Sequence, residues 1–135
     1  MITHLLDTNI ISYALRPQNQ SLANRLHAAM ADEHVAISAV TRAEIRAGQF
    51  RMSAQDKRRA AINQLLDVLP VLVWTAQAAD TYGETHTLLM NKGQPIGIMD
   101  VQIAAHALAA NLILVTHNTR HFERIPGLKL EDWMV

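Results

Sequence analysis

The sequence predicts a single α/β domain in which a central parallel β-sheet is flanked by helices on both faces. Short apolar segments alternate with longer segments of helical periodicity along the 135 residues, an order typical of crossover connections and parallel sheets. Segments 4–6 and 112–115 lack the polar alternation of a half-exposed strand, as expected for strands that are covered on both faces. A chain of this length fits one domain, residues 1–135.

The composition is that of a globular protein. Hydrophobic residues make up 50% of the chain and charged residues 18%, which excludes an intrinsically disordered protein. The lack of cysteine excludes disulfides and thiolate metal sites. The N-terminus has no basic region followed by a long apolar run, and no stretch reaches about 18 apolar residues. We therefore expect no signal peptide, no membrane span and a cytoplasmic location.

The first half of the chain is expected to run strand, helix, helix, strand, helix, helix. Apolar residues three or four positions apart mark the helices. Two helices start with capping-box spacing, Thr41 to Glu44 and Ser53 to Asp56. The predicted strands are 2–6 and 35–38, and the predicted helices are 8–15, 21–33, 40–50 and 53–69.

In the second half, strands and helices alternate around a glycine-containing turn. Thr75 stands where it can cap the helix that follows. The segment 93–97 (GQPIG) breaks the chain before an alanine-rich helix. The predicted strands are 71–74, 112–116 and 128–133, and the predicted helices are 76–92 and 98–111.

Polar residues stand where two of these strands end. Asp7 follows the first strand, and Thr116, His117 and Asn118 stand at the end of the fourth. In parallel sheets, ligand sites lie beyond the carboxyl ends of the strands. We therefore expect these side chains at the edge of one site.

Asp100 and Glu44 are two further acids that can join this site. Asp100 lies in the first turn of a helix that continues almost wholly apolar, so it either caps that helix or points at a ligand. Glu44 can join the site, act as the capping-box partner of Thr41, or pair with Arg42 or Arg46. Spacing alone leaves these alternatives open.

Four segments together resemble the PIN domain, and specifically the VapC-type toxins of bacterial toxin–antitoxin pairs. They are LLDTNIISYAL, ISAVTRAEIRAG, GQPIGIMDVQIAAHA and LILVTHNTRHFERIPGLKLEDW, in the order and spacing of that family. The resemblance implies an α/β/α ribonuclease whose acids hold a divalent metal, here Asp7, Glu44 and Asp100. Many members have a fourth acid where this chain has Asn118, so the chain departs from that pattern and resembles a subset of VapC toxins.

The resemblance and the chemistry together imply roles for these residues. Phosphodiester cleavage needs an activated water and charge stabilisation, which Mg²⁺, or alternatively Mn²⁺, supplies when carboxylates hold it. We expect Asp7 and Asp100 to be the metal ligands. Glu44 would bind through water or orient the nucleophile, and Asn118 would hold a metal-bound water or a neighbouring acid. The residues expected to orient these groups are Thr8, Asn9 and Thr116.

Half of the basic residues lie within 42–59, although the formal net charge of the chain is zero. The segment is either a solvated helix face or a patch that faces phosphates. If Glu44 faces a metal, we expect Arg42 and Arg46 at the rim of the same pocket, where they would bind RNA.

The resemblance also implies partners. Substrates of such proteins are structured RNAs, commonly tRNA, and the subset that this chain resembles cuts the anticodon stem-loop of initiator tRNA. A small VapB-like antitoxin would cover the acids, with residues 9–15 as one wall of an apolar groove. The implied assembly is a homodimer.

Other classes fit the sequence less well. The alternative is a PIN-fold binding module that acts with a DNA-binding partner and has little nuclease activity, because Asn118 replaces an acid. His117 and His121 have the spacing of a zinc pair but lack the intervening glutamate. A haloacid-dehalogenase phosphatase needs a second aspartate where Asn9 stands. A receiver domain needs an acceptor aspartate after its third strand, where this chain has Trp74.

Overall fold

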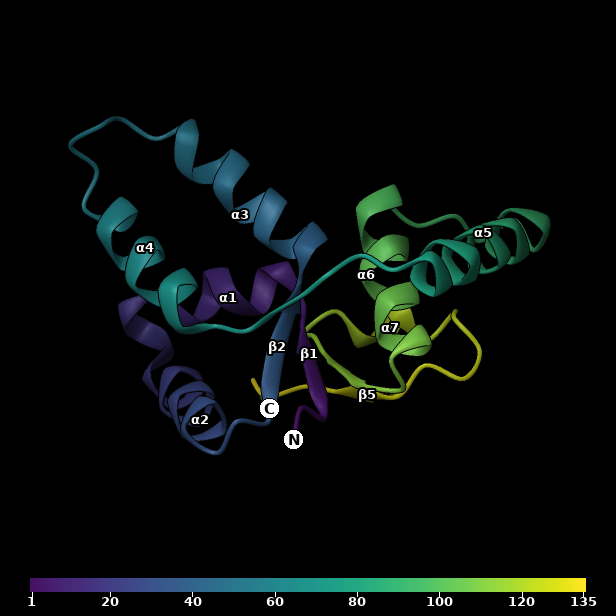
Figure 1. Ribbon diagram of the computed structural model, residues 1–135, viewed down its shortest axis with the longest axis horizontal. Helices are drawn as coiled ribbons and strands as arrows, with labels where there is room; N and C mark the ends of the chain where they lie inside the picture. Colours follow the sequence, from purple (N-terminus) through teal and green to yellow (C-terminus); the bar gives the residue numbers. More distant parts are fainter.

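Five parallel strands form the centre of the molecule (Figure 1). The structure, a computed structural model, describes residues 1–135. The strands lie in the order β3-β2-β1-β4-β5, and every neighbouring pair is parallel, as the sequence predicts. The strands are β1 (His4–Leu6), β2 (Val35–Ser38), β3 (Val71–Leu72), β4 (Ile113–Val115) and β5 (Leu130–Glu131).

Helices make most of the connections between the strands. None of them combines the length and apolarity that crossing a membrane requires. They are α1 (Thr8–Ala14), the 3-10 turn η1 (Pro17–Asn19), α2 (Gln20–Ala31), α3 (Ala39–Phe50), α4 (Arg58–Val68), α5 (Ala76–Asn91), α6 (Ile98–Ala109) and α7 (Thr119–Phe122).

Each face of the sheet has its own apolar core. Successive strand residues point to opposite faces, so Leu6 and Val115 join one core while Leu5 and Leu114 join the other. Side chains from α1, α2, α3 and α4 complete the first core, and side chains from α5, α6 and α7 complete the second. The prediction that helices flank both faces is confirmed.

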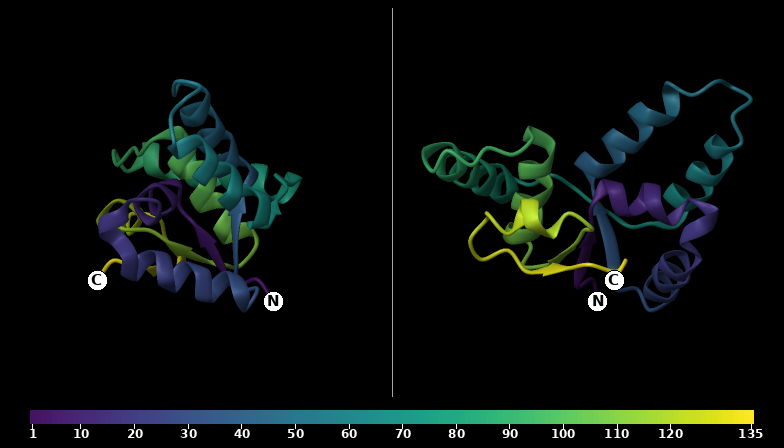
Figure 2. Two further views of the ribbon diagram at one scale, coloured as in Figure 1. Left: turned by 90° about the vertical axis from the view of Figure 1, so that its left-hand side faces the viewer. Right: turned by 180° about the vertical axis from the view of Figure 1, so that it is seen from behind.

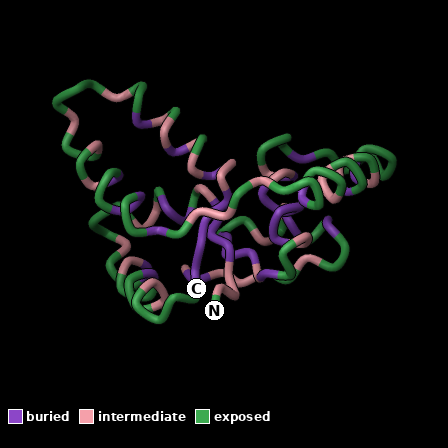
Figure 3. Tube along the Cα trace, viewed as in Figure 1, coloured by how far each residue is buried: buried purple, intermediate pink, exposed green.

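The pair α3 and α4 extends away from the sheet, and both views in Figure 2 show the loop that joins them at the far end. Buried residues concentrate in the strands and in the helical turns that lie against them (Figure 3). The loop at 51–57 and much of α5 are exposed. The inner strands β1, β2 and β4 therefore end among buried residues, whereas the tip of the α3–α4 pair is open to solvent.

The capping box predicted between Thr41 and Glu44 is wrong. The N-cap of α3 is Ser38, whose Oγ accepts the N–H of Val40 at 3.1 Å, so the helix begins earlier than predicted. Thr41 is consequently a buried residue inside the helix. Glu44 is therefore not needed at the helix start and is available for a contact with another element.

The helix predicted over 53–69 begins only at Arg58, so the predicted cap at Ser53 is also wrong. The carboxylate of Asp56 accepts the backbone N–H of Arg58 at 2.9 Å and its guanidinium at 2.7 Å. These bonds close a turn just before α4 and leave Ser53 outside the helix.

The two outer strands, β3 and β5, are shorter than predicted and span two residues each. Each pairs with one neighbour only, so less backbone pairing holds it extended. The predicted cap by Thr75 is confirmed, because its Oγ1 accepts the N–H of Ala78 at 3.0 Å.

A buried histidine ties α6 to the start of α3. His106 is 3% exposed, and its Nδ1 lies 2.8 Å from the Oγ of Ser38. The Oγ of Ser38 already accepts the N–H of Val40, so its own hydrogen is free to be donated to the imidazole. Trp74 packs edge-on against the ring, with 5.4 Å between the centroids. Burial lowers the pKa of His106, against a backbone hydrogen bond to Val73 that raises it.

We expect His106 to make the folded protein less stable in acid. The unfolded state takes up a proton below about pH 6.5 that the buried imidazole resists, so its contribution to stability is present above that pH and is lost as the pH falls. Melting temperatures of the wild type and His106→Gln, measured with chelator from pH 5 to pH 8, test this. The difference in free energy of unfolding between the wild type and His106→Gln should move against the wild type toward pH 5, by up to about 1.4 kcal/mol per pH unit. The difference in melting temperature should follow it. A constant difference across the range would contradict it.

Candidate metal and catalytic site

Asp7 lies at the carboxyl end of β1, and the residue is 2% exposed. Its backbone N–H donates to the carbonyl of Val115 at 2.9 Å, which fixes the residue against β4. The hydroxyl of Thr116 donates to Oδ2 of Asp7 at 2.9 Å, and the same hydroxyl oxygen accepts the N–H of Asn118 at 3.0 Å. Two neighbouring strand ends therefore hold this carboxylate in one orientation.

Glu44 reaches the same region from α3. The hydroxyl of Thr8, which follows Asp7 in the chain, donates to Oε1 of Glu44 at 2.8 Å. The Thr8 hydroxyl also lies 3.3 Å from the hydroxyl of Thr41. The start of α1 therefore holds Glu44 close to the end of β1.

Asp100 comes from the first turn of α6, in the other half of the molecule. Its Oδ2 lies 3.4 Å from Nε2 of His121 on α7. The charge of Asp100 is close enough to Asp7 to raise the pKa of that residue. Strand β1, helix α3 and helix α6 thus each contribute one acid to a common region.

The electrostatics of this region favour a bound cation. The pKa of Asp7 rises from 3.8 to about 6, first because burial disfavours its ionised form. Hydrogen bonds from the Thr116 hydroxyl and the Thr8 backbone oppose this rise, whereas the charges of Asp100 and Glu44 add to it. The site carries more negative charge than its own hydrogen-bond donors stabilise.

The donor set fits a hard divalent cation. The three acids offer carboxylate oxygens, the ligands that Mg²⁺ and Mn²⁺ prefer. No three side chains of His, Cys, Asp or Glu are gathered closely enough to enclose an ion by themselves. Mg²⁺ needs no such cage, because it keeps several waters and is usually held by one or two carboxylates.

The other predicted site residues differ in their contacts. Thr8 and Thr116 hydrogen-bond to acids of the site. Asn9 and Asn118 are exposed, and their side chains make no hydrogen bond with these acids.

The predicted position of Arg42 and Arg46 at the rim of this site is wrong. Two positions along a helix correspond to a rotation of about 200°, so both arginines face away from Glu44. The guanidinium of Arg42 donates to the carbonyl of Leu66 at 3.1 Å, and that of Arg46 donates to the side chain of Asn63 at 2.7 Å. Both side chains therefore hold α3 against α4.

His121 contacts one of the predicted site acids, although the sequence analysis considered it only as half of a zinc pair with His117. His117 and His121 contact different acids, because His117 pairs with Asp132 at 3.0 Å while His121 faces Asp100 at 3.4 Å. One feature of the sequence could have indicated this contact. His121 lies in the short helix that directly follows β4, and predicted site residues stand at the end of that strand.

The fold and the site define a class: a parallel α/β domain that gathers carboxylates at the carboxyl edge of its sheet. The family model of the PIN domain matches residues 4–128. The chain belongs to the PIN domain family and, within it, to the VapC type.

Similar proteins cover nearly the whole chain. Ribonuclease VapC2 of Rickettsia felis is 36% identical over 130 residues, covering 96% of this chain and 97% of its own. The tRNA(fMet)-specific endonuclease VapC of Salmonella typhimurium is 33% identical over 133 residues, covering 98% and 99%.

Solved structures of VapBC complexes are also similar to this chain over nearly its whole length. VapBC2 from Rickettsia felis, bound to a DNA fragment from its promoter, matches with a TM-score of 0.88 and 36% identity, covering 98% of this chain and 99% of that one. DNA-bound VapBC from Salmonella typhimurium matches with a TM-score of 0.90 and 33% identity, with the same coverage.

Replacing Asp7 by Asn should raise the melting temperature of the metal-free protein at pH 8. The raised pKa means that the contribution of Asp7 to stability is present below about pH 4 and lost as the pH rises through about 6. Asn keeps an acceptor for Thr116 without the charge, so the gain is up to about 3 kcal/mol. Thermal melts with chelator at pH 5 and pH 8 measure it.

Asp67→Asn is the matched control, because Asp67 is an exposed acid on α4. Its melting temperature should stay within about 1 °C of the wild type, as surface substitutions usually do. A destabilised Asp7→Asn protein at pH 8 would show that the ionised carboxylate is well accommodated without metal.

Proposed function

We propose that this chain is an endoribonuclease toxin that depends on a divalent metal, Mg²⁺ or alternatively Mn²⁺. The observation that carries the proposal is the buried carboxylate of Asp7, whose pKa is raised to about 6 and which lies within the field of two further acids. A cation would relieve this charge, and it would supply the activated water and the charge stabilisation that hydrolysis of a phosphodiester needs. The names of the relatives, ribonuclease and tRNA endonuclease, support the same function.

The three acids would have different roles in catalysis. Asp7 and Asp100 would hold the metal, and Glu44 would contact it through water or orient the attacking water. When bound, the ion activates water and stabilises charge on the reacting phosphate. Thr116 and Thr8 keep the carboxylates of Asp7 and Glu44 from rotating, which fixes the positions of their oxygens.

Asn118 leaves the pocket with one negative charge fewer than a four-acid site. It would hold a metal-bound water or a neighbouring acid. A second metal should then bind weakly until the phosphate of the substrate adds its own charge.

The proposed substrate is a structured RNA, with the anticodon stem-loop of initiator tRNA as the first choice. The name of the Salmonella typhimurium relative, a tRNA(fMet)-specific endonuclease, supports this choice. Sequencing RNA ends after induction of the chain in bacteria tests it, with Asp7→Asn as the inactive control. New ends confined to the initiator tRNA loop are expected. Ends that are the same for both proteins would exclude the proposed nuclease.

A PIN-fold module with little nuclease activity is the alternative. The solved relatives are VapBC complexes bound to DNA, which favours a role beside a DNA-binding partner. Titration with Mg²⁺ separates the two functions, because a pure binding module does not need to hold the ion.

Arg51 is better placed than Arg42 and Arg46 to bind the RNA. It lines a pocket of about 270 Å³ together with Thr8 and Glu44, and no hydrogen bond or ion pair occupies its guanidinium. Arg16 lines an adjoining pocket that shares several residues with the first one. Two arginines therefore line adjoining pockets, one of which contains Glu44.

Replacing Arg16 and Arg51 together by Gln should weaken RNA binding and flatten its salt dependence. For each phosphate that is no longer neutralised, the slope of log affinity against log salt falls by about 0.7 to 0.9. The measurement is titration of labelled stem-loop RNA at several salt concentrations, on an Asp7→Asn background that prevents cleavage. Arg42→Gln with Arg46→Gln is the matched control, and it should change stability more than slope. Equal slopes for both pairs would place the RNA elsewhere.

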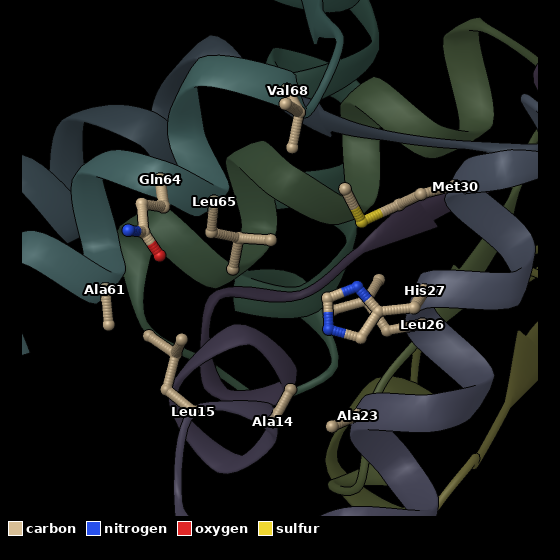
Figure 4. A pocket seen from close by; sticks show the side chains of 10 residues that line it. All are labelled: Ala14, Leu15, Ala23, Leu26, His27, Met30, Ala61, Gln64, Leu65 and Val68. Carbon is tan, nitrogen blue, oxygen red and sulfur yellow. The ribbon is translucent and has the colours of Figure 1, made fainter.

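An apolar groove lies beside the site and fits the proposed VapB-like antitoxin. Figure 4 shows side chains of α1, α2 and α4 that point toward one another around a hollow. This hollow has a volume of about 230 Å³. Eight of its ten lining residues are hydrophobic, and Leu15 also lines the pocket that contains Glu44. An amphipathic antitoxin helix in this groove could therefore continue directly over the acids. We also propose the homodimer that the family resemblance implies.

Val68→Glu should abolish neutralisation by the paired antitoxin without reducing toxicity. Val68 is 63% exposed and lines the groove, so a carboxylate there would have to be buried against the antitoxin. Val73→Glu is the control, because Val73 is 72% exposed and lies outside the groove. Pull-down with the tagged antitoxin and growth rescue on co-expression are the measurements. Loss of binding by both variants, or by neither, would contradict this docking site.

A further inference from the structure

The short helix α7 holds one imidazole against the acid site. It follows the end of β4, and its Phe122 is 1% exposed in the core that α6 shares. His121 precedes this anchor, and its ring lies edge-on to that of Phe122 with 5.5 Å between the centroids. Its side chain is 24% exposed, so the imidazole is partly enclosed. The position of His121 is therefore set by core packing.

Nε2 of this imidazole lies at a distance from the carboxylate of Asp100 that suits two ligands of one metal ion. Nε2 of His121 is 3.4 Å from Oδ2 of Asp100. Two donor atoms each about 2.1 Å from one ion stand about 3.0 Å apart at a right angle, so a small closing movement suffices for both to bind one ion. His117 provides the contrast, because it pairs with Asp132 and packs edge-on against Tyr13.

We propose that His121 is a nitrogen ligand of the metal site, contributed beside Asp100, and that it makes the site prefer Mn²⁺ to Mg²⁺. The proposal rests on the metal-dependent function proposed above and adds the identity of the ion. Mg²⁺ is a hard cation that takes oxygen ligands and gives up water reluctantly. Mn²⁺ also prefers oxygen ligands, but as a first-row transition metal it accepts an imidazole nitrogen more readily than Mg²⁺ does, and affinity for such a site rises from Mn²⁺ to Co²⁺.

Calorimetric titration of the chelator-treated protein with MgCl₂, MnCl₂ and CoCl₂ measures the preference. The wild type should bind Mn²⁺ at least tenfold more tightly than Mg²⁺, and Co²⁺ more tightly still. His121→Gln should lose about tenfold in affinity for Mn²⁺ and Co²⁺ while its affinity for Mg²⁺ changes less than threefold. His117→Gln is the matched control and should behave as the wild type.

The coordination itself has a spectroscopic signature. Electron spin echo modulation of the Mn²⁺-loaded protein should show a histidine nitrogen that is present in His117→Gln and absent in His121→Gln. A spectrum without that nitrogen in the wild type, or equal Mn²⁺-to-Mg²⁺ ratios in the wild type and His121→Gln, would overturn the proposal.

Asp7→Asn separates this proposal from the function on which it rests. If this variant loses all three ions while His121→Gln matches the wild type, the metal site stands and the role of His121 fails. If Asp7→Asn keeps the affinity of the wild type, or if the wild type binds none of the ions, the metal site itself is wrong and the role of His121 fails with it.

Discussion

The buried carboxylate of Asp7 is the constraint on which the rest of the molecule depends. Removing an ionised carboxylate from water is costly, and the rise of its pKa to about 6 reflects that cost. The hydroxyl of Thr116 offsets part of it, but the charges of Glu44 and Asp100 add to it. The fold thus maintains an unfavourable charge at a fixed position, which a bound cation would relieve.

The two cores bring the other acids to this position from opposite sides. Glu44 is carried by α3, which packs Ile45 into the core on one face, and Asp100 is carried by α6, which lies in the core on the other. The bond between His106 and Ser38 joins α6 to the first residue before α3. The distance between the two acid-bearing helices therefore depends on a buried polar contact as well as on apolar packing.

Two different surfaces adjoin the acids, one of them cationic and the other apolar. At the end of α3 lies the guanidinium of Arg51, which makes no hydrogen bond, and along α1 lies the apolar groove between α2 and α4. Leu15 lines both the groove and the pocket that contains Arg51. An RNA bound beside Arg51 and an antitoxin bound in the groove would therefore approach each other at Leu15.

The sequence by itself determined the parallel sheet, its two helical layers and the positions of Asp7 and Thr116, because hydrophobic periodicity is local and parallel strands share one carboxyl edge. Only the tertiary structure decided where α3 and α4 begin, since those starts depend on whether a polar side chain caps its own helix or bonds elsewhere. It also decided that Arg42 faces α4, that Thr8 holds Glu44, and that His121 faces Asp100. Each of these contacts joins residues at least 21 positions apart, as the pair Asp100 and His121 shows, and no local pattern encodes the direction in which two distant segments present their side chains.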